Sequence, residues 1–309
     1  MTQKVALVGN YNIDLIMGTV PEMPAWGTET LIETVLPRVA GGAGNTAQAL
    51  GSLGVSALAV GAVGDDAYGQ EIIKTLTGLN LDVSLLKQVK GSQTGIGFTI
   101  LKEDGERSFL TYLGVLADYQ DSDLLAALPK VQEADIVLFA GYNLLPALTT
   151  FGLEKFFAGV KKAGATLLFD TGWDVNDWRG DAIAKVERLL PYVDIFLPNL
   201  AEARAISQVA GDLPAIGRRL VDLGTKSVVI KLGPEGAAYY DRENEILAKG
   251  VKVKAVDTTG AGDSFNAGVI YGLLKEWSPD KYLDFANRLA AHVIQRLEER
   301  YPSLSQLLD

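Results

Sequence analysis

Short runs of apolar residues alternate with longer amphipathic segments along most of this chain. The apolar runs have the length of buried β-strands and lie at residues 5–8, 57–60, 136–140, 166–169, 195–197 and 227–231. The segments between them are long enough for crossover helices, and apolar residues recur at helical spacing over residues 45–53, 69–76, 148–162 and 213–223. This alternation predicts an α/β fold with a doubly wound, mostly parallel sheet flanked by helices. In such folds ligands bind beyond the carboxyl ends of the strands.

Two stretches, at about residues 13–40 and 91–115, interrupt the alternation. The first contains Pro21, Pro24 and Pro37 around a strand-like run at residues 29–36. The second has strand-like runs at residues 95–101 and 107–113 on either side of a turn at residues 103–106. Both read as hairpin-like insertions, and we expect them to pair into a small β-lid over the strand ends. The alternative is that they are edge strands of the main sheet. Without a repeat or an interdomain linker, residues 1–309 are expected to form a single domain.

Composition removes several classes of function. A net charge of -10 and a pI near 4.8 argue against a nucleic-acid partner, which would require a basic surface. The chain has no cysteine, which excludes disulfides and thiolate catalysis and favours a cytoplasmic enzyme. Its apolar run at residues 5–8 is too short for a signal peptide or a membrane span. With His292 as the one histidine, a Ser-His-Asp triad or a multi-histidine metal site is excluded, and carboxylates, lysines and backbone amides remain as working groups.

The stretch DTTGAGDSFNAG at residues 257–268 joins a small-residue turn to a carboxylate and then to a helix. Residues 251–256 alternate as a strand does, and residues 265–277 have helical spacing. Between them the amides of Gly260, Ala261 and Gly262 can converge at a helix N-terminus to bind a phosphate, where Asp263 would be a base for an attacking hydroxyl. The alternative is a glycine turn with a capping Asp263, which stabilises a helix by about 0.3–1 kcal/mol.

A second glycine-rich stretch, AGGAGNTA, occupies residues 40–47. It matches the dinucleotide fingerprint only loosely, because it does not follow the first strand. We interpret Gly42 as a point of close approach for a polyhydroxylated ligand and Asn45 as a donor and acceptor for its hydroxyls, with a helix cap at Asn45 as the alternative. Asn12 and Asp14 follow the first predicted strand near this loop, and a carboxylate such as Asp14 can hold a diol or cap a loop.

Two further strand ends carry polar residues. In PNLAE, Asn199 and Glu202 lie on one side of a first helical turn, where they would hold magnesium-bound water beside phosphates or form an N-cap. After the strand-like run at residues 227–231, Lys231 is followed by Gly233 and Gly236, as in a nucleotide-facing turn or an ordinary hairpin. The chain contains no GxxxxGK[ST] motif, so a P-loop mechanism is excluded.

Taken together, these motifs resemble the ribokinase-like, or PfkB, family of carbohydrate and nucleoside kinases over essentially the whole chain. The family has a β-lid on a doubly wound core. The resemblance implies ATP and Mg²⁺ as cofactors, with potassium in several members. It implies the following roles: Asp263 as catalytic base, with Gly260, Ala261 and Gly262 as anion hole; Asp14, Gly42 and Asn45 at the sugar, beside Asn12; Glu202 organising magnesium and phosphate, near Asn199; Lys231, Gly233, Gly236 and Asn287 at the nucleotide; and Asp257 and Thr259 at a monovalent-cation site.

The function predicted from these motifs is ATP-dependent phosphorylation of a hydroxymethyl group of a sugar or sugar-like alcohol. A nucleoside kinase of the same family and a catalytically silent sugar-binding sensor are the alternatives, with a nicotinamide-dependent dehydrogenase a distant third. An exposed apolar face of the lid would pair two subunits as a homodimer.

Overall fold

A large mixed sheet forms the centre of the molecule. The computed structural model describes residues 3–102 and 107–308. The nine strands of this sheet run in the order β13 (Glu245–Lys249), β12 (Gly236–Tyr240), β11 (Ser227–Lys231), β10 (Ile195–Phe196), β9 (Thr166–Asp170), β8 (Ile136–Ala140), β1 (Val5–Gly9), β4 (Ala57–Gly64), β5 (Asp82–Val89). The strands from β11 to β5 are parallel, whereas β12 and β13 add an antiparallel edge. This confirms the predicted mostly parallel sheet.

Helices cover both faces of the sheet because its strands are apolar on both sides. In β1, Val5 and Leu7 belong to one hydrophobic cluster, while Ala6 and Val8 belong to the other, as alternation along a strand requires. The first cluster is completed by α1 (Gly42–Ser52), α2 (Ala67–Gly78), α8 (Ala261–Leu274), α9 (Pro279–Val293) and α10 (Leu304–Leu308). The second is completed by α3 (Asp121–Val131), α4 (Thr150–Lys162), α5 (Ala182–Leu189), α6 (Leu200–Ser207) and α7 (Leu213–Asp222).

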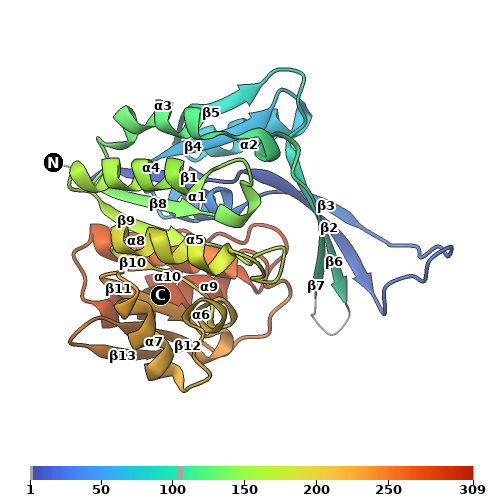
Figure 1. Ribbon diagram of the computed structural model, residues 1–309. Helices are drawn as coiled ribbons and strands as arrows, with labels where there is room; N and C mark the ends of the chain where they lie inside the picture. The colour runs from blue at the N-terminus through green and yellow to red at the C-terminus, as the bar shows by residue number, and fades with distance from the viewer. Residues whose placement is uncertain (1–2, 103–106, 309) are drawn as a thin grey trace.

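A second, four-stranded sheet projects from one end of this core (Figure 1). Its order is β3 (Val35–Ala40), β2 (Asn12–Val20), β6 (Gly95–Lys102), β7 (Arg107–Tyr112). The two predicted insertions meet where β2 pairs in parallel with β6, and the predicted small β-lid is present. Pro37 lies in β3, an edge strand, where a residue without an N–H is tolerated. The turn predicted at residues 103–106 lies outside the described residues.

Two strand predictions were wrong. Residues 251–256 form no strand. The pairing of β13 with β12 extends only as far as Gly236 and Lys249, and beyond Gly250 the chain pairs with no described strand, with Val256 donating to the Ile294 carbonyl instead. The strand-like run at residues 29–36 is irregular up to residue 34, and β3 begins only at Val35. Residues 21–35 are exposed, so alternation there packs against no core.

Short 3-10 turns complete the described structure: η1 (Gly114–Asp118), η2 (Tyr142–Leu144), η3 (Leu190–Tyr192) and η4 (Gly233–Glu235). Within residues 3–102 and 107–308, no helix is both long enough and apolar enough to cross a membrane.

Candidate active site

A chain of side-chain amides leads from the end of β1 to Asp14. Asn10 Nδ2 donates to Asn12 Oδ1 at 3.0 Å, and Asn12 Nδ2 donates to Asp14 Oδ1 at 2.9 Å. The other end of Asn10 ties this chain to the glycine loop, because its Oδ1 accepts from the Gly42 amide at 2.9 Å. Burial raises the pKa of Asp14 to about 6, against the opposing charge of Arg38 and the Asn12 bond. Asn12, Asp14 and Gly42 therefore lie together, as expected.

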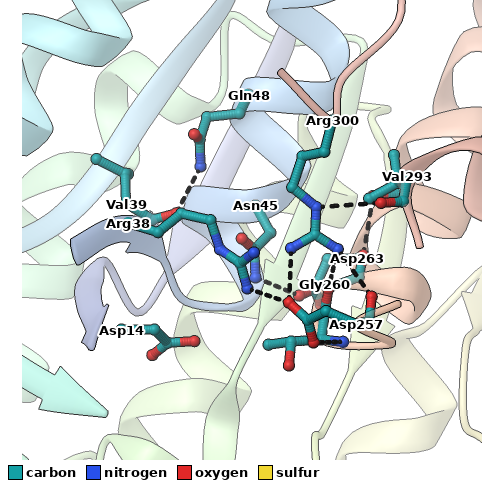
Figure 2. Close-up of polar contacts among 12 residues, drawn as sticks. Asp14, Arg38, Val39, Asn45, Gln48, Asp257, Gly260, Asp263, Val293 and Arg300 are labelled. Carbon is teal, nitrogen blue, oxygen red and sulfur yellow. Dashed lines mark hydrogen bonds and ion pairs between the residues drawn. The ribbon is translucent and has the colours of Figure 1, made fainter. Parts of the chain in front are cut away.

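The N-termini of α1 and α8 meet across a hydrogen bond between Asn45 and Asp263. Asn45 Nδ2 donates to Asp263 Oδ2 at 2.8 Å (Figure 2). Asn45 Oδ1 accepts from the Tyr301 hydroxyl at 3.1 Å. Thr46, the next residue of α1, donates from Oγ1 to the Asp263 carbonyl at 3.1 Å. Both polar atoms of Asn45 are thus engaged, and its described contacts position Asp263.

Asp263 lies in the first turn of α8, next to the glycine turn. Gly260 is the residue before the helix and has φ +75°, a left-handed conformation that favours glycine. A Cβ on Gly260 would lie 3.2 Å from Asn45 Nδ2, so little room exists there for a side chain. Because the first turn of a helix leaves N–H groups without helical acceptors, the amides of Gly260 and Gly262 are available to an anion beside Asp263, whereas the Ala261 amide donates to the Thr258 carbonyl at 3.3 Å.

The carboxyl of Asp263 has a pKa close to neutral pH. Burial raises its pKa from 3.8 to about 7, and the negative charge of Asp170 adds to that rise. The Asn45 hydrogen bond and the positive charge of Lys231 oppose it. A carboxyl with such a pKa is a better base near pH 7 than one with an ordinary value.

A second polar cluster lies behind the glycine turn. Lys231, at the end of β11, donates from Nζ to Asp170 Oδ2 at 2.7 Å, and Asn266 Nδ2 reaches the same oxygen at 2.5 Å. Burial disfavours both charges, but the pairing outweighs it, so the pKa of Asp170 falls and that of Lys231 rises. A Cβ on Gly262 would lie 3.4 Å from Lys231 Nζ. Lys231 therefore lies directly against the glycine turn.

Asn199 and Glu202 form a capping box at the start of α6. Asn199 Oδ1 accepts from the Glu202 amide at 2.9 Å, and Glu202 Oε2 accepts from the Asn199 amide at 2.8 Å. Asn199 Nδ2 also donates to Glu202 Oε1 at 2.7 Å. Burial, followed by the charge of Asp170, raises the pKa of Glu202 to about 7. The N-cap is thus real, and it also fixes a carboxyl beside the Asp170–Lys231 pair.

Gly233, Gly236 and Asn287 lie around the turn between β11 and β12. Gly233 has φ +61° in the turn, and Gly236 opens β12 where a Cβ would lie 2.1 Å from the Ala248 carbonyl oxygen. Asn287 Nδ2 donates to the Lys249 carbonyl at 3.2 Å, so it borders the same end of β13. These residues flank the edge of the sheet beyond Lys231.

Asp257 and Thr259 occupy the loop before Gly260, where two arginines meet them. Arg38 Nη2 donates to Asp257 Oδ2 at 2.8 Å, and Arg300 Nη2 donates to the Thr259 carbonyl at 2.6 Å (Figure 2). Burial opposes ionisation of Asp257, but the Thr259 bond and the charge of Arg38 outweigh it and lower the pKa. This carboxylate is therefore charged and paired.

Comparison with known proteins agrees with this geometry. A family model described as pfkB family carbohydrate kinase matches residues 2–306. The chain belongs to the pfkB family of carbohydrate kinases. It is 31% identical over 270 residues to probable fructokinase-7 of Arabidopsis thaliana, an alignment that covers 82% of this chain and 76% of that protein. It is 29% identical over 298 residues to ribokinase of Haemophilus influenzae, which covers 94% of this chain and 92% of that one.

The fold of this kinase is also that of its solved relatives. It superposes on Arabidopsis thaliana ribokinase, solved in complex with ribose and ATP, with a TM-score of 0.83 at 25% identity, covering 100% of this chain and 98% of that one. The predicted family, fold and enzyme class are thereby confirmed.

Several residues of the kinase site were not singled out from the sequence. Asp170 and Asn10 lie at strand ends that the fold class marks as ligand-facing, so position pointed to these ends but assigned neither side chain a role. Asn266, in α8, follows Asp263 within the same motif. Arg38 and Arg300 carry no motif, and only the structure brings them to the loop before Gly260.

Proposed function

We propose that this kinase transfers the γ-phosphoryl group of ATP to a hydroxymethyl group of a sugar or sugar-like alcohol, with Asp263 as general base. The observation that carries the proposal is the placement of Asp263. It is held by Asn45 at 2.8 Å in the first turn of α8, beside the glycine turn, with its pKa raised to about 7. A base and an anion-binding turn on the same helix end are what phosphoryl transfer to an alcohol requires.

In the proposed reaction, Asp263 takes the hydroxyl proton of the substrate's hydroxymethyl group. The oxygen of that hydroxymethyl group then forms a bond to the γ-phosphorus. The bond from that phosphorus to the β,γ-bridging oxygen breaks, and ADP leaves. Amides of Gly260, Ala261 and Gly262 meet the charge on the transferred group. Lys231, which lies against Gly262, adds a fixed positive charge on the same side.

The sugar would lie between this base and the start of the small sheet. Asp14 would accept hydrogen bonds from two neighbouring hydroxyls, with Asn12 holding the carboxylate in place at 2.9 Å. Gly42 would allow the ligand close to the backbone, and Asn45 would act mainly by orienting Asp263. Burial is the main cause of the raised pKa of Asp263, and the charge of Asp14 adds a smaller rise, which supports their placement around one ligand.

The nucleotide would lie on the other side of the glycine turn, along Asn199, Lys231, Gly233, Gly236 and Asn287. When bound, the magnesium ion that accompanies ATP would neutralise part of the negative charge of the phosphates. Glu202 suits contact with it through water, because both its oxygens already accept bonds from Asn199. Burial, followed by the charge of Asp170, raises the pKa of Glu202, and a divalent cation bound nearby would favour its ionised form.

The test is a panel of pentoses, hexoses, sugar acids, sugar phosphates and nucleosides assayed for ADP formation, with wild type and Asp263→Asn. We expect one sugar or sugar-like alcohol to give turnover that falls by about 100-fold or more in the variant. If a nucleoside is instead the preferred substrate, the protein is a nucleoside kinase of the same family and the proposed sugar substrate is wrong. Binding of a sugar without ADP formation would identify a sensor and refute the proposed reaction.

We also propose that the small sheet pairs two copies of this kinase. Exposed apolar residues gather on and near it, including Trp26, Leu31, Phe109, Leu110 and Tyr112. Sedimentation of wild type and Leu110→Asp should show a dimer and a monomer, respectively. A wild type that stays monomeric at high concentration would contradict this pairing.

A further inference from the structure

The loop before Gly260 is held by the guanidinium group of Arg300. Its Nη2 donates to the carbonyl oxygens of Asp257 and Thr259, at 3.3 and 2.6 Å, and its Nη1 donates to Asp257 Oδ2 at 3.3 Å (Figure 2). Its Nε donates to the Val293 carbonyl at 3.3 Å, at the end of α9. One planar cation thus collects oxygens from the Asp257 loop and anchors them to α9.

A second guanidinium reaches the same carboxylate from the small sheet. Arg38, in β3, donates from Nη2 to Asp257 Oδ2 at 2.8 Å. The side chains of Asp257, Arg300 and Arg38 are only 0%, 3% and 9% exposed, respectively. Two permanent positive charges therefore share one buried carboxylate, and solvent screens them little.

A monovalent cation does not fit these residues. Such an ion needs several oxygens directed at one point. In this loop the carbonyls of Asp257 and Thr259 and the Asp257 Oδ2 atom already accept from Arg300, whereas Thr259 Oγ1 is buried and has no hydrogen-bond partner among the described residues. A further positive charge in the same buried space would also be repelled by both guanidinium groups. Three oxygens that could bind such an ion therefore already lie against a cation that the chain itself supplies.

We propose that Arg300 is a built-in cation that takes the place of potassium in this kinase and positions the glycine turn. Thr259 directly precedes Gly260, so fixing its carbonyl fixes the start of the turn that carries the anion-binding amides. Arginine keeps its charge at any working pH and presents its donors in a rigid fork. This inference rests on the proposed function of residues 260–262, and Arg300 acts through them rather than on the substrate.

The first experiment measures wild-type turnover and thermal midpoint in potassium, sodium and tetramethylammonium chloride at equal ionic strength. We expect kcat/KM to agree within about twofold among the three salts, and the midpoint to show no potassium-specific rise. Thallium(I), a spectroscopic probe for potassium sites, should show no saturable binding. A saturable potassium or thallium site, or a potassium-specific gain in both turnover and midpoint, would overturn the proposal. The midpoint and thallium measurements need no substrate, so they remain decisive even if the proposed reaction fails.

The second experiment removes the guanidinium. Arg300→Ala should lower kcat more than it raises KM, and added guanidinium or potassium ions should restore part of kcat, because the vacated oxygens regain a cation. Arg300→Lys, which keeps charge but loses the fork, should retain more activity than Arg300→Ala and keeps the test available if the alanine variant does not fold. Arg296→Ala, an exposed arginine of the same segment, is the control and should show neither loss nor rescue. Loss of kcat in a folded Arg300→Ala without rescue by either ion would refute the built-in cation.

Discussion

Replacing Asp263 by asparagine should make the protein less active and more stable at the same time. The folded state raises the pKa of this carboxyl from 3.8 to about 7, mainly by burial. A shift of that size corresponds to about 4 kcal/mol at pH values above both. Because Asp263 is partly accessible to solvent, we expect roughly half of that figure, about 2 kcal/mol, to appear in the free energy of unfolding.

The sign and pH range of this effect follow from the direction of the shift. Since the pKa is raised on folding, the folded protein binds the Asp263 proton more tightly than the unfolded chain does. Ionisation of Asp263 thus destabilises the folded protein. This destabilisation is absent below pH 3.8, grows between pH 3.8 and about pH 7, and is constant at higher pH. Asparagine stays neutral throughout and can still accept the Asn45 bond, so its stabilising effect should grow over the same range.

The assay is urea unfolding of wild type and Asp263→Asn at about pH 5 and about pH 8, with the larger difference expected at the higher pH. Asp280→Asn is a matched control, because Asp280 lies in the first turn of α9 but is exposed. That substitution should instead cost about 0.3–1 kcal/mol, since it removes a charge favoured by the helix dipole. A stability difference for Asp263→Asn that does not depend on pH, or that is destabilising at pH 8, would refute the reasoning about burial.

Three further predictions concern the same site. The kcat/KM of wild type should rise with pH through about 7. Asp170→Asn should move the midpoint of this pH profile to lower pH, because it removes a negative charge near Asp263. A move to higher pH would contradict the assignment of the profile to Asp263. Gly260→Ala should lower kcat by about tenfold or more and stability by about 1 kcal/mol, because φ is +75° there and a Cβ would approach Asn45; unchanged kcat would remove the turn from the mechanism. Glu202→Gln should weaken the magnesium dependence of turnover, whereas Asn199→Ala should lower stability by about 1 kcal/mol because the helix cap is lost. If turnover depends on magnesium concentration equally in Glu202→Gln and wild type, the Glu202 carboxyl is only structural.

The sequence predicted those parts of the fold whose patterns are local. The buried strands read as apolar runs because both faces of the sheet are covered, and the main helices read from their spacing. The glycine turn before Asp263 was visible because a left-handed φ and close packing both demand small residues. Residues 251–256 misled because alternation predicts a strand only where a neighbouring strand remains to be paired.

Partnerships between distant residues could not be predicted. Asn45 was expected at the substrate, yet its amide lies on Asp263, which is 218 residues away in the chain. Arg38 and Arg300 meet Asp257 across 219 and 43 residues. Neither arginine sits in a motif, and a charged residue in a sequence gives no indication of its partner. They meet only because β3 and the segment after α9 both reach the loop before α8.

Asp257 and Asp263 show why the partners differ at the two ends of the glycine turn. Burial opposes ionisation of Asp257, but the Thr259 hydrogen bond and the charge of Arg38 lower its pKa, which suits a structural anchor but would leave a base too weak to accept a proton from an alcohol. Asp263 instead accepts from a neutral amide, and Lys231, whose charge acts on it, is bound to Asp170. Its pKa therefore stays near 7. A lysine bonded directly to Asp263 would stabilise the fold and lower the basicity of the carboxylate, so keeping that charge one side chain away is what allows Asp263 to act as a base.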